Sequence, residues 1–301
     1  MQEAAVAPKF KLWMAAIKPP MYTVAVIPIS VGTAVAFSET RQFNLGTYLT
    51  FLGSAILIIA WLNLSNDVFD ADTGIDKNKA HSVVNLTGNQ SLVFWISNLF
   101  LALGVLGVVA IATQQKDPTL IGIILLCCAL GYTYQGPPFR LGYQGLGELI
   151  CFITFGPLAI AAAYYSQAQT FSTLSLAVGT LIGISTSIIL FCSHFHQVKD
   201  DLAAGKRSPI VRLGTARGAM VLGWATASLY LLTLAGMGLG IFSPWTLLVF
   251  ASLPFAIQLV RHVQRYHDQP EQVSNCKFFA VNLQFVSGVL LAISFTIPRL
   301  L

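Results

Sequence analysis

Long apolar runs, separated by short polar connections, dominate the hydrophobic pattern of this 301-residue chain. Each run has about 17 to 25 residues, the length at which an α-helix crosses a bilayer. The runs are continuously apolar and lack the alternation that strands of a transmembrane barrel show. The pattern predicts an all-α polytopic membrane protein with about nine transmembrane helices, at residues 20–37, 45–65, 91–113, 118–134, 148–165, 172–195, 217–240, 244–262 and 277–298.

The composition agrees with a membrane environment for the whole chain, which we expect to form a single domain over residues 1–301. Hydrophobic residues make up 55% of the chain and charged residues 10%, and the mean hydropathy is +0.70. These values are typical of proteins whose solvent is lipid. The N-terminal segment is polar and basic and leads into a full-length apolar run, so we expect no cleavable signal. The five cysteines lack metal-ligand spacing and are interpreted as packing residues.

Positive charge falls almost entirely on one side of the predicted spans. If the N-terminus is cytoplasmic, that side receives all of the 17 lysines and arginines except Arg41, Lys116 and Arg299. The positive-inside rule then assigns this side to the cytoplasm, together with the polar connections near 66–90 and 196–216. Six aspartates share the same side. Polar connections of any membrane protein must lie outside the hydrocarbon, but the opposite connections are short and nearly uncharged, so one face is predicted to perform a polar task.

The first acidic segment, NLSNDVFDADTGIDKNKA at 63–80, directly follows the second predicted span. Its first acids are expected in the last turns of that helix, before the glycine of the segment ends it. Asn63, Asn66 and Asp70 have spacings that place them on one helical face, with Asp67 beside them. Carboxylate and amide oxygens are ligands that Mg²⁺ prefers, and Mg²⁺ usually shares its coordination shell with water and substrate phosphates.

A second acidic segment, CSHFHQVKDDLAAGKRSPIVRLG at 192–214, closes the sixth predicted span on the same side. Gln197 and Asp201 are four residues apart and share a helical face, and His194 lies three residues before Gln197. Two acidic helix ends on one side predict two half-sites with a metal-bridged diphosphate between them. Basic residues nearby would pair with the remaining phosphate oxygens, although topology explains each one singly better than this role does: Lys18, Lys77, Lys79, Lys199, Lys206 and Arg207.

The two acidic segments resemble the aspartate-rich motifs of the UbiA superfamily of intramembrane aromatic prenyltransferases. NDVFDADTGIDKN resembles the first motif and VKDDLAAGKR the second. Residues 13–36 are similar to the first helix of that family, and residues 132–159 to the connection after its fourth helix. The first motif is especially similar to the branch that prenylates 1,4-dihydroxy-2-naphthoate, nearest to its phytyl-transferring type in cyanobacteria and plastids. The similarity extends over almost the whole chain.

The resemblance implies a function that the residues alone do not specify. It implies nine helices around a central cavity, Mg²⁺ as cofactor, and phytyl or another prenyl diphosphate as donor. It also implies 1,4-dihydroxy-2-naphthoate as acceptor, loss of the acceptor carboxylate as carbon dioxide, and a place in phylloquinone or menaquinone biosynthesis. The membrane would be a bacterial inner membrane or one of plastid type. No nucleic acid is expected as a partner.

Two departures from the superfamily pattern affect which acids would bind metal. Gly74 stands where a common form of the first motif has its last aspartate, and Asp76 follows two residues later, as in the naphthoate branch. Gln197 occupies the first acidic position of the second motif. Only Asp201 matches that motif, and Asp200 is an additional neighbour.

The predicted site residues fall into three groups. Those expected to bind metal are Asn66, Asp67, Asp70, Asp76, Asp200 and Asp201. Those expected to take part directly in catalysis are Asn66, Asp70, Asp201, Tyr132 and Lys77. Those expected to bind substrate are Lys18, Asn63, Lys79, Tyr134, Arg140, Glu148, His194, Gln197, Lys199 and Lys206.

Several of these roles have alternatives. Tyr132 and Tyr134 would stabilise an allylic cation through their ring faces, or belong to the aromatic belt at the interface. Arg140 would hold the acceptor carboxylate, or serve topology alone. Glu148 would contact substrate or metal, or complement the dipole of its own helix.

Alternative functions are of two kinds. Within the superfamily, the acceptor could be 4-hydroxybenzoate or homogentisate. From a different class, a transporter would also carry acids in a membrane protein, but the acids here cluster at helix ends on one side rather than through the membrane depth.

Overall fold

The structure, a computed structural model, describes residues 9–75 and 82–300. Every regular element in these two ranges is helical, and no strand occurs in them. The prediction of an all-α fold is confirmed. The calls on Asp76, Lys77 and Lys79 lie outside the described residues.

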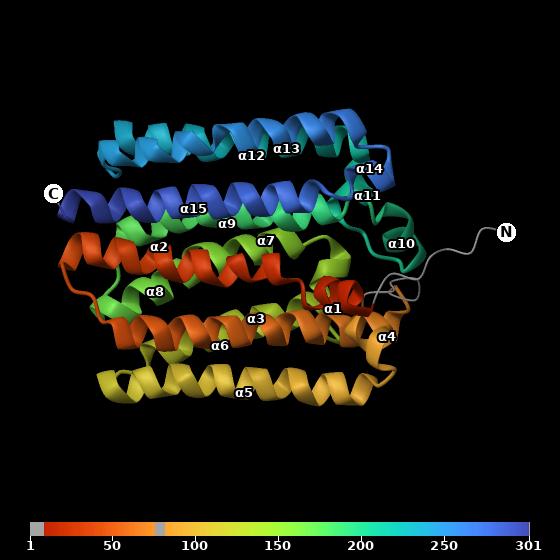
Figure 1. The fold of residues 1–301 in the computed structure, drawn as a ribbon, viewed down its shortest axis with the longest axis horizontal. Coiled ribbons are helices and arrows are strands. Elements are labelled where there is room, and N and C mark those ends of the chain that lie inside the picture. The colour runs from red at the N-terminus through yellow and green to blue at the C-terminus, as the bar shows by residue number, and fades with distance from the viewer. Residues whose placement is uncertain (1–8, 76–81, 301) are drawn as a thin grey trace.

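Helices that run between the two ends of the molecule form its body (Figure 1). They are α2 (Thr23–Thr40), α3 (Leu45–Thr73), α5 (Gln90–Gln115), α6 (Thr119–Gln135), α7 (Gly147–Ile153) continued by η3 (Thr154–Leu158) and α8 (Ala159–Ala168), α9 (Thr173–Ser193), α12 (Thr215–Gly238), η4 (Pro244–Ser252) continued by α13 (Leu253–Tyr266), and α15 (Cys276–Leu300). All of the predicted spans are therefore helical where they were expected.

Over the described residues, eight helical segments are long and apolar enough to cross a membrane, and α6 is a shorter apolar helix. At 1.5 Å per residue, the 17 residues of α6 extend over about 26 Å, close to the roughly 30 Å of a hydrocarbon core. Helix α1 (Lys9–Ile17) and the end of α15 lie at opposite ends of the molecule (Figure 1). Because an even number of crossings would return the chain to its starting side, this placement agrees with α6 as a ninth crossing.

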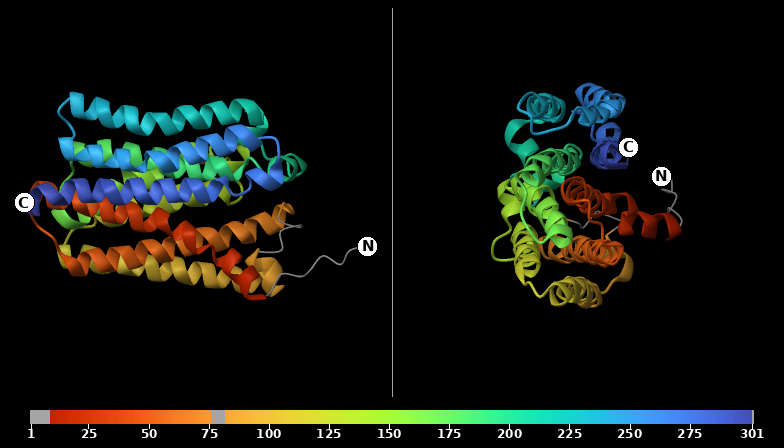
Figure 2. Two further views of the ribbon diagram at one scale, coloured as in Figure 1. Left: turned by 45° about the horizontal axis from the view of Figure 1, so that its top comes forward. Right: turned by 90° about the vertical axis from the view of Figure 1, so that its left-hand side faces the viewer.

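Short helices gather around the end of the bundle where the N-terminus lies (Figures 1 and 2). We call this the site end, because both acidic segments lie there. The short elements are α1 (Lys9–Ile17), η1 (Pro19–Tyr22), α4 (Val83–Thr87), η2 (Leu141–Gln144), α10 (Val198–Ala203), α11 (Pro209–Leu213) and α14 (Pro270–Val273).

Helix boundaries follow local capping chemistry. Asn44 and Asn89 cap α3 and α5, each accepting a hydrogen bond from a backbone N–H three residues later, at 2.9 and 3.0 Å. Gly74 ends α3 with φ of 73°, a left-handed conformation that costs glycine little. The prediction that a glycine ends this helix is confirmed, and residues 63–73 of the first acidic segment lie on the last turns of α3.

Glycines let α7 and η3 approach α9 closely. A Cβ atom on Gly156 would lie 2.4 Å from the backbone oxygen of Gly179, and one on Gly183 would lie 2.7 Å from that of Phe152. Small residues allow such contact between membrane helices. Pro157 lies in the π-helical turn η3. Proline has no backbone N–H to donate, and the wider hydrogen-bond spacing of a π-turn accommodates this loss. This packing brings the start of α7 beside the end of α9, where the second acidic segment begins.

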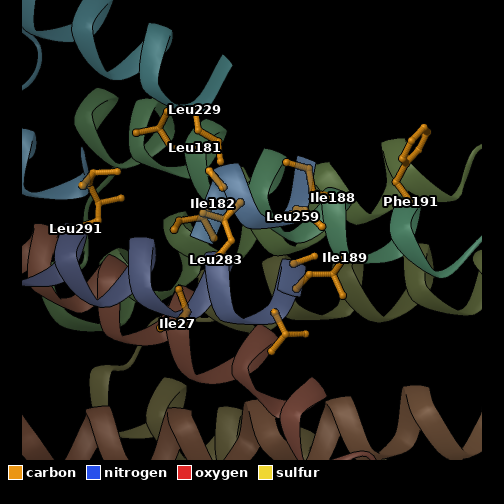
Figure 3. Close-up of a cluster of buried hydrophobic side chains, with 14 of the residues drawn as sticks. Ile27, Leu181, Ile182, Ile188, Ile189, Phe191, Leu229, Leu259, Leu283 and Leu291 are labelled. Carbon is orange, nitrogen blue, oxygen red and sulfur yellow. The ribbon is translucent and has the colours of Figure 1, made fainter. Parts of the chain in front are cut away.

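The largest cluster of buried apolar side chains joins α2, α9, α12, α13 and α15 (Figure 3). Leu283 of α15 is fully buried, as are Leu259 of α13 and Leu222 of α12, and Ile27 of α2 is 1% exposed. A second cluster joins α2 and α8 to α3, α5 and α6. Together the two clusters hold the helices that carry the two acidic segments in one body.

Candidate active site

The first half of the site lies on the last two turns of α3. Asn66 donates from Nδ2 to Oδ2 of Asp70 at 2.6 Å, one turn further on. The hydroxyl of Tyr143, from η2, donates to Oδ1 of Asp70 at 3.0 Å and lies 2.8 Å from the hydroxyl of Thr73. The predicted shared face of Asn66 and Asp70 is therefore present, and neutral donors hold the Asp70 carboxylate.

The other two acids of α3 point toward neighbouring elements. Asp67 is 1% exposed, with Oδ1 3.4 Å from Nζ of Lys18 and Oδ2 accepting from the backbone N–H of Val83 at 2.8 Å. Asp72 accepts a hydrogen bond from Gln90, the first residue of α5, at 2.7 Å. Asp67 thus links α3 to α4 and to Lys18, which precedes η1. Asp72 links α3 to α5.

The second half of the site is a buried cluster where α9 meets α10 and α7. The imidazole of His194 lies 3.2 Å from Oε1 of Glu148 through Nε2, and 3.4 Å from Oδ2 of Asp201 through Nδ1. Nζ of Lys206 lies 3.4 Å from Oδ1 of Asp201. His194 is 3% exposed and Asp201 is fully buried. Two acids and two basic groups therefore share one buried volume.

The opposite charges in this cluster stabilise one another's ionised forms. Burial lowers the pKa of His194, but the carboxylates of Asp201 and Glu148 outweigh it, so the pKa lies above its usual value of 6.5. Burial raises the pKa of Asp201, but His194 and Lys206 outweigh it and hold the pKa below its usual value. An imidazolium and a carboxylate are the forms that this arrangement favours.

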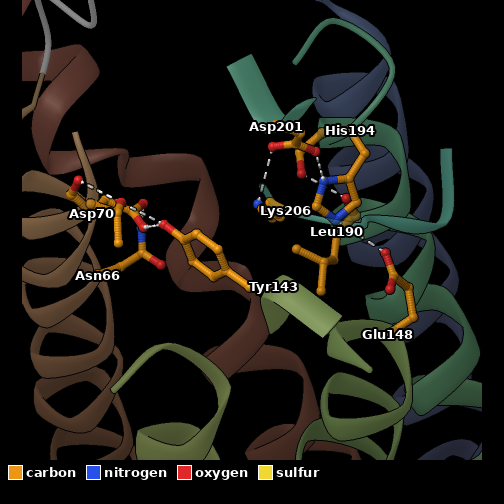
Figure 4. Close-up of polar contacts among 10 residues, drawn as sticks. Asn66, Asp70, Tyr143, Glu148, Leu190, His194, Asp201 and Lys206 are labelled. Carbon is orange, nitrogen blue, oxygen red and sulfur yellow. Dashed lines mark hydrogen bonds and ion pairs between the residues drawn. The ribbon is translucent and has the colours of Figure 1, made fainter. Parts of the chain in front are cut away.

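Tyr143 lies between the two halves (Figure 4). The centroid of its ring lies 5.7 Å from Nζ of Lys206, in the second half. Its hydroxyl donates a hydrogen bond to Asp70, in the first half. Burial raises the pKa of Tyr143 and the Asp70 charge raises it further, so the phenol stays protonated and donates. Contacts thus run without interruption from Asp70 through Tyr143 and Lys206 to Asp201.

The last turn of α6 and the connection after it supply two more predicted residues, Tyr134 and Arg140. The ring of Tyr134 packs against glycines: a Cβ on Gly142 or Gly147 would come within 2.6 or 2.7 Å of it. Arg140 has φ of 43°, and within the described residues its buried Nε has no hydrogen-bond partner. A buried guanidinium N–H of this kind is a donor available to an anionic ligand.

Other predicted residues lie away from the cluster. Tyr132 is 37% exposed, and its hydroxyl donates to the backbone oxygen of Pro137 at 2.7 Å. Lys199 and Asp200 are exposed on α10, whereas Asp201 points inward. Gln197 directly precedes α10, and its backbone oxygen accepts from the N–H of Asp201 at 2.8 Å. The roles given to these residues stay predictions.

Asn63 lies one turn before Asn66 on α3. Its Nδ2 is buried, and its side chain lies beside the phenol of Tyr22. The substrate-binding role given to Asn63 stays a prediction.

The sequence analysis missed Tyr143. The stretch RLGYQGLGE was part of the connection compared with the family, but only Tyr132, Tyr134, Arg140 and Glu148 were singled out in that connection. The available signal was an aromatic hydroxyl flanked by glycines in the same connection. Its contact with residues 73 positions away in sequence is visible only in the folded chain.

The donor set suits a hard divalent cation. Asn66 and Asp70 present oxygen ligands on one helix face, and Asp201 and Glu148 add two carboxylates whose oxygens lie 3.2 to 3.4 Å from His194 and Lys206. Over the part of the chain that the structure describes, no three His, Cys, Asp or Glu side chains converge on a single metal position. Mg²⁺ usually takes one or two carboxylates from a protein and completes its shell with water and substrate phosphates.

Comparison with known proteins identifies relatives over nearly the full length. Residues 25–286 match the UbiA prenyltransferase family. The chain is 67% identical to 2-carboxy-1,4-naphthoquinone phytyltransferase of Synechocystis, over 94% of this chain and 92% of that protein. It is 45% identical to the chloroplastic protein of the same name from Arabidopsis thaliana, over 97% of this chain and 78% of that protein.

A solved structure supports the fold independently. The UbiA homolog from Archaeoglobus fulgidus bound to DMAPP and Mg²⁺ superposes with a TM-score of 0.62 at 16% identity, covering 96% of this chain and 99% of that one. At this identity the likeness concerns the fold. Sequence, helix arrangement and the two facing motifs agree, and the chain belongs to the UbiA prenyltransferase family.

Proposed function

We propose that the protein transfers a phytyl group from its diphosphate to 1,4-dihydroxy-2-naphthoate, in the biosynthesis of phylloquinone or a related naphthoquinone. The observation that carries the choice of substrates is the 67% identity to a phytyltransferase of that type over 94% of the chain. The facing halves of the site, with carboxylates on both and Lys206 between them, support a diphosphate as the donor group. The whole chain acts as a single transmembrane domain in this proposal.

The diphosphate would bind between the two halves with Mg²⁺. Asn66 and Asp70 on one side and Asp201 on the other would hold the cation, and Lys206 and Lys18 would pair with phosphate oxygens. Bound Mg²⁺ supplies positive charge that stabilises the departing pyrophosphate. The Mg²⁺ seen with the archaeal homolog supports this part of the proposal.

The transfer breaks the allylic C–O bond of the donor and forms a C–C bond to the acceptor ring. The electron pair of the C–O bond leaves with pyrophosphate, and the allylic cation accepts a pair from the ring carbon that carries the carboxylate. Carbon dioxide then leaves, and the pair from its C–C bond restores the aromatic ring. The proton of the neighbouring ring hydroxyl is released on attack and regained after decarboxylation, so no oxidant or reductant is consumed.

The residues of this chain would orient and protect the reactants. The Tyr134 ring, packed on Gly142 and Gly147, would face the allylic cation, a contact worth about 0.5 to 2 kcal/mol. The unpartnered Nε of Arg140 would donate to the acceptor carboxylate. The surrounding apolar helices would exclude water, which otherwise traps the cation.

The reduced acceptor is the chemically suitable form. The names of the relatives refer to the naphthoquinone, which is two electrons more oxidised than the dihydroxynaphthoate. A cationic electrophile requires an electron-rich ring, and the hydroquinone supplies it. We therefore expect transfer to the reduced form.

A membrane assay tests the proposal directly. Membranes containing the protein receive phytyl diphosphate, Mg²⁺ and 1,4-dihydroxy-2-naphthoate labelled with ¹³C in the carboxylate, under reducing conditions. The expected products are phytylated naphthoquinol and labelled carbon dioxide in equal amounts, both lost with EDTA. Parallel reactions with 4-hydroxybenzoate, homogentisate and the oxidised acceptor test specificity. Product from one of these, and none from dihydroxynaphthoate, would refute the assignment.

The site end is proposed to face the cytoplasm, together with the N-terminus. The distribution of lysine and arginine supports this orientation. Both substrates would then reach the site from the cytoplasm or from the inner leaflet.

A further inference from the structure

Tyr143 contacts both halves of the site through different atoms. Its hydroxyl donates to Oδ1 of Asp70 at 3.0 Å, and Oδ2 of the same carboxylate accepts from Asn66. Its ring face meets the ammonium of Lys206 at 5.7 Å, and that ammonium lies 3.4 Å from Asp201. Its backbone oxygen accepts from the N–H of Arg207 at 2.8 Å. One residue thus links the end of α3 with the segment between α10 and α11.

The backbone around Tyr143 is fixed to the second half of the site. Arg212 donates from Nη2 to the backbone oxygen of Gln144 at 2.6 Å and from Nε to that of Arg207 at 3.0 Å. Gly145 has φ of 81°, and a Cβ there would lie 2.6 Å from the Arg207 oxygen. These contacts hold η2 against the segment after α10. They therefore fix the position of Tyr143 relative to the second half of the site.

The Tyr143 side chain also contacts the first half of the site, through Asp70. Asp70 is on α3, which packs mainly against α5 and is not part of the α10 to α11 segment. The Tyr143 hydroxyl fixes the orientation of the Asp70 carboxylate, and its ring restrains the flexible Lys206 side chain. Groups that are already oriented lose less conformational entropy when a ligand binds between them.

We propose that Tyr143 is a positioning residue that fixes Asp70 relative to Lys206 and Asp201, and thereby strengthens binding of a magnesium diphosphate between the two motifs. The inference rests on the proposed function, since that function supplies the diphosphate. Tyr143 acts through its neighbours, and no bond to it forms or breaks in the reaction.

Substitution by phenylalanine separates the two contacts of the side chain. Tyr143→Phe removes the hydroxyl at Asp70 and keeps the ring at Lys206. We expect about a tenfold weaker affinity for pyrophosphate in the presence of Mg²⁺, the size expected for one hydrogen bond to a charged group. The measurement is calorimetric titration of purified protein in lipid nanodiscs, with inorganic pyrophosphate and Mg²⁺ as the probe.

A matched control removes the same atom elsewhere. The hydroxyl of Tyr48 lies 2.9 Å from that of Ser30, joining α2 to α3 near the end of the bundle away from the site. Tyr48→Phe should leave the pyrophosphate affinity within about twofold of wild type. Thermal unfolding of both variants shows whether folding is equally intact.

The ring contact is tested with leucine. Tyr143→Leu removes both contacts and should weaken pyrophosphate binding by a further two- to fivefold, roughly the size of an exposed cation–π contact. In a Lys206→Gln background the phenylalanine and leucine variants should bind equally, because the partner of the ring is gone.

The outcomes separate a positioning role from a merely structural one. If Tyr143→Phe lowers the unfolding temperature but binds magnesium pyrophosphate as tightly as wild type, the positioning role is excluded. If wild type binds pyrophosphate but forms no phytylated naphthoquinol, the proposed function fails and the result for Tyr143 still stands. Wild type that does not bind magnesium pyrophosphate would overturn both.

Discussion

The two best-placed carboxylates of the site have different surroundings. Asp70 accepts hydrogen bonds from the neutral side chains of Asn66 and Tyr143, whereas Asp201 faces the cationic Lys206 and the imidazole of His194. Neutral donors orient a carboxylate without cancelling its charge, while cations close to it compensate that charge. Asn66 and Tyr143 therefore orient the carboxylate of Asp70, while Lys206 and His194 stabilise the negative charge of Asp201.

Removal of the Asp70 carboxylate should abolish turnover. Asp70→Ala is expected to lower kcat/KM by more than about hundredfold, because a ligand oxygen for the cation and its negative charge are lost together. The assay is phytyl transfer in membranes, with unfolding temperature as a check on folding. Asp72→Asn is the control: Asp72 lies on the same turns but bonds to Gln90, and we expect a change of about twofold or less. Near-normal activity of Asp70→Ala would contradict the central role of that residue.

The buried His194 should make stability depend on pH. Its pKa is raised in the folded state, so the folded protein holds this proton more tightly than the unfolded chain does. The resulting stabilisation is complete below the usual pKa of 6.5 and is lost as pH rises through the folded pKa. Wild type should therefore exceed His194→Gln in unfolding temperature at pH 6, and the difference should shrink toward pH 9.

This pH series is measured in detergent with EDTA, so that no metal competes for Asp201. A difference between wild type and His194→Gln that stays constant from pH 6 to pH 9 would show that the imidazole contributes through packing alone.

At the scale of elements, the site depends on how closely α7 and η3 lie against α9. Their glycine contacts place Glu148 near the start of α7 within 3.2 Å of His194, just after the end of α9. Ser187 strengthens the pair by donating to the backbone oxygen of Glu148 at 2.9 Å. The sequence pattern predicted both helices but gave no indication that these two residues would meet, because glycine contacts between helices leave no periodic signal.

A methyl group at this contact should separate the helices. Gly156→Ala places a Cβ 2.4 Å from the Gly179 oxygen, a backbone atom that cannot move alone. Overpacking of this kind costs about 1–3 kcal/mol, so we expect a lower unfolding temperature together with reduced transfer activity. Gly122→Ala on α6 is the control, since a Cβ there meets nothing within 4 Å and alanine favours helix. Equal stability of the two variants would contradict the close approach.

At the scale of the whole molecule, nine crossings would put the two chain ends on opposite sides of the membrane. The described structure has its N-terminal and C-terminal ends at opposite ends of the bundle (Figure 1). Eight spans meet the length expected of a membrane helix, so the side on which the C-terminus lies depends on whether the 17-residue α6 also crosses.

Reporter fusions decide this point. With the site end in the cytoplasm, a green fluorescent protein fused before α1 should fluoresce, and alkaline phosphatase fused after α15 should be active. If the same reporter is active at both ends of the chain, the number of crossings is even and α6 does not span the membrane. Fusions after α5 and after α6 then show directly whether α6 crosses.

The sequence by itself determined the helical membrane fold, the positions of the spans, and the shared face of Asn66 and Asp70. These features follow from local composition and from the fixed helical repeat, which act over a few residues. The motif resemblance also predicted the family, which the comparisons confirm.

Only the tertiary structure decided which distant groups come together. It placed His194 between Glu148 and Asp201, turned Asp200 outward and Asp201 inward, and brought Tyr143 to Asp70. These contacts depend on close helix packing and on the course of the connection after α6. Because neither is encoded in the spacing of residues along one helix, the pattern of the sequence could not specify them.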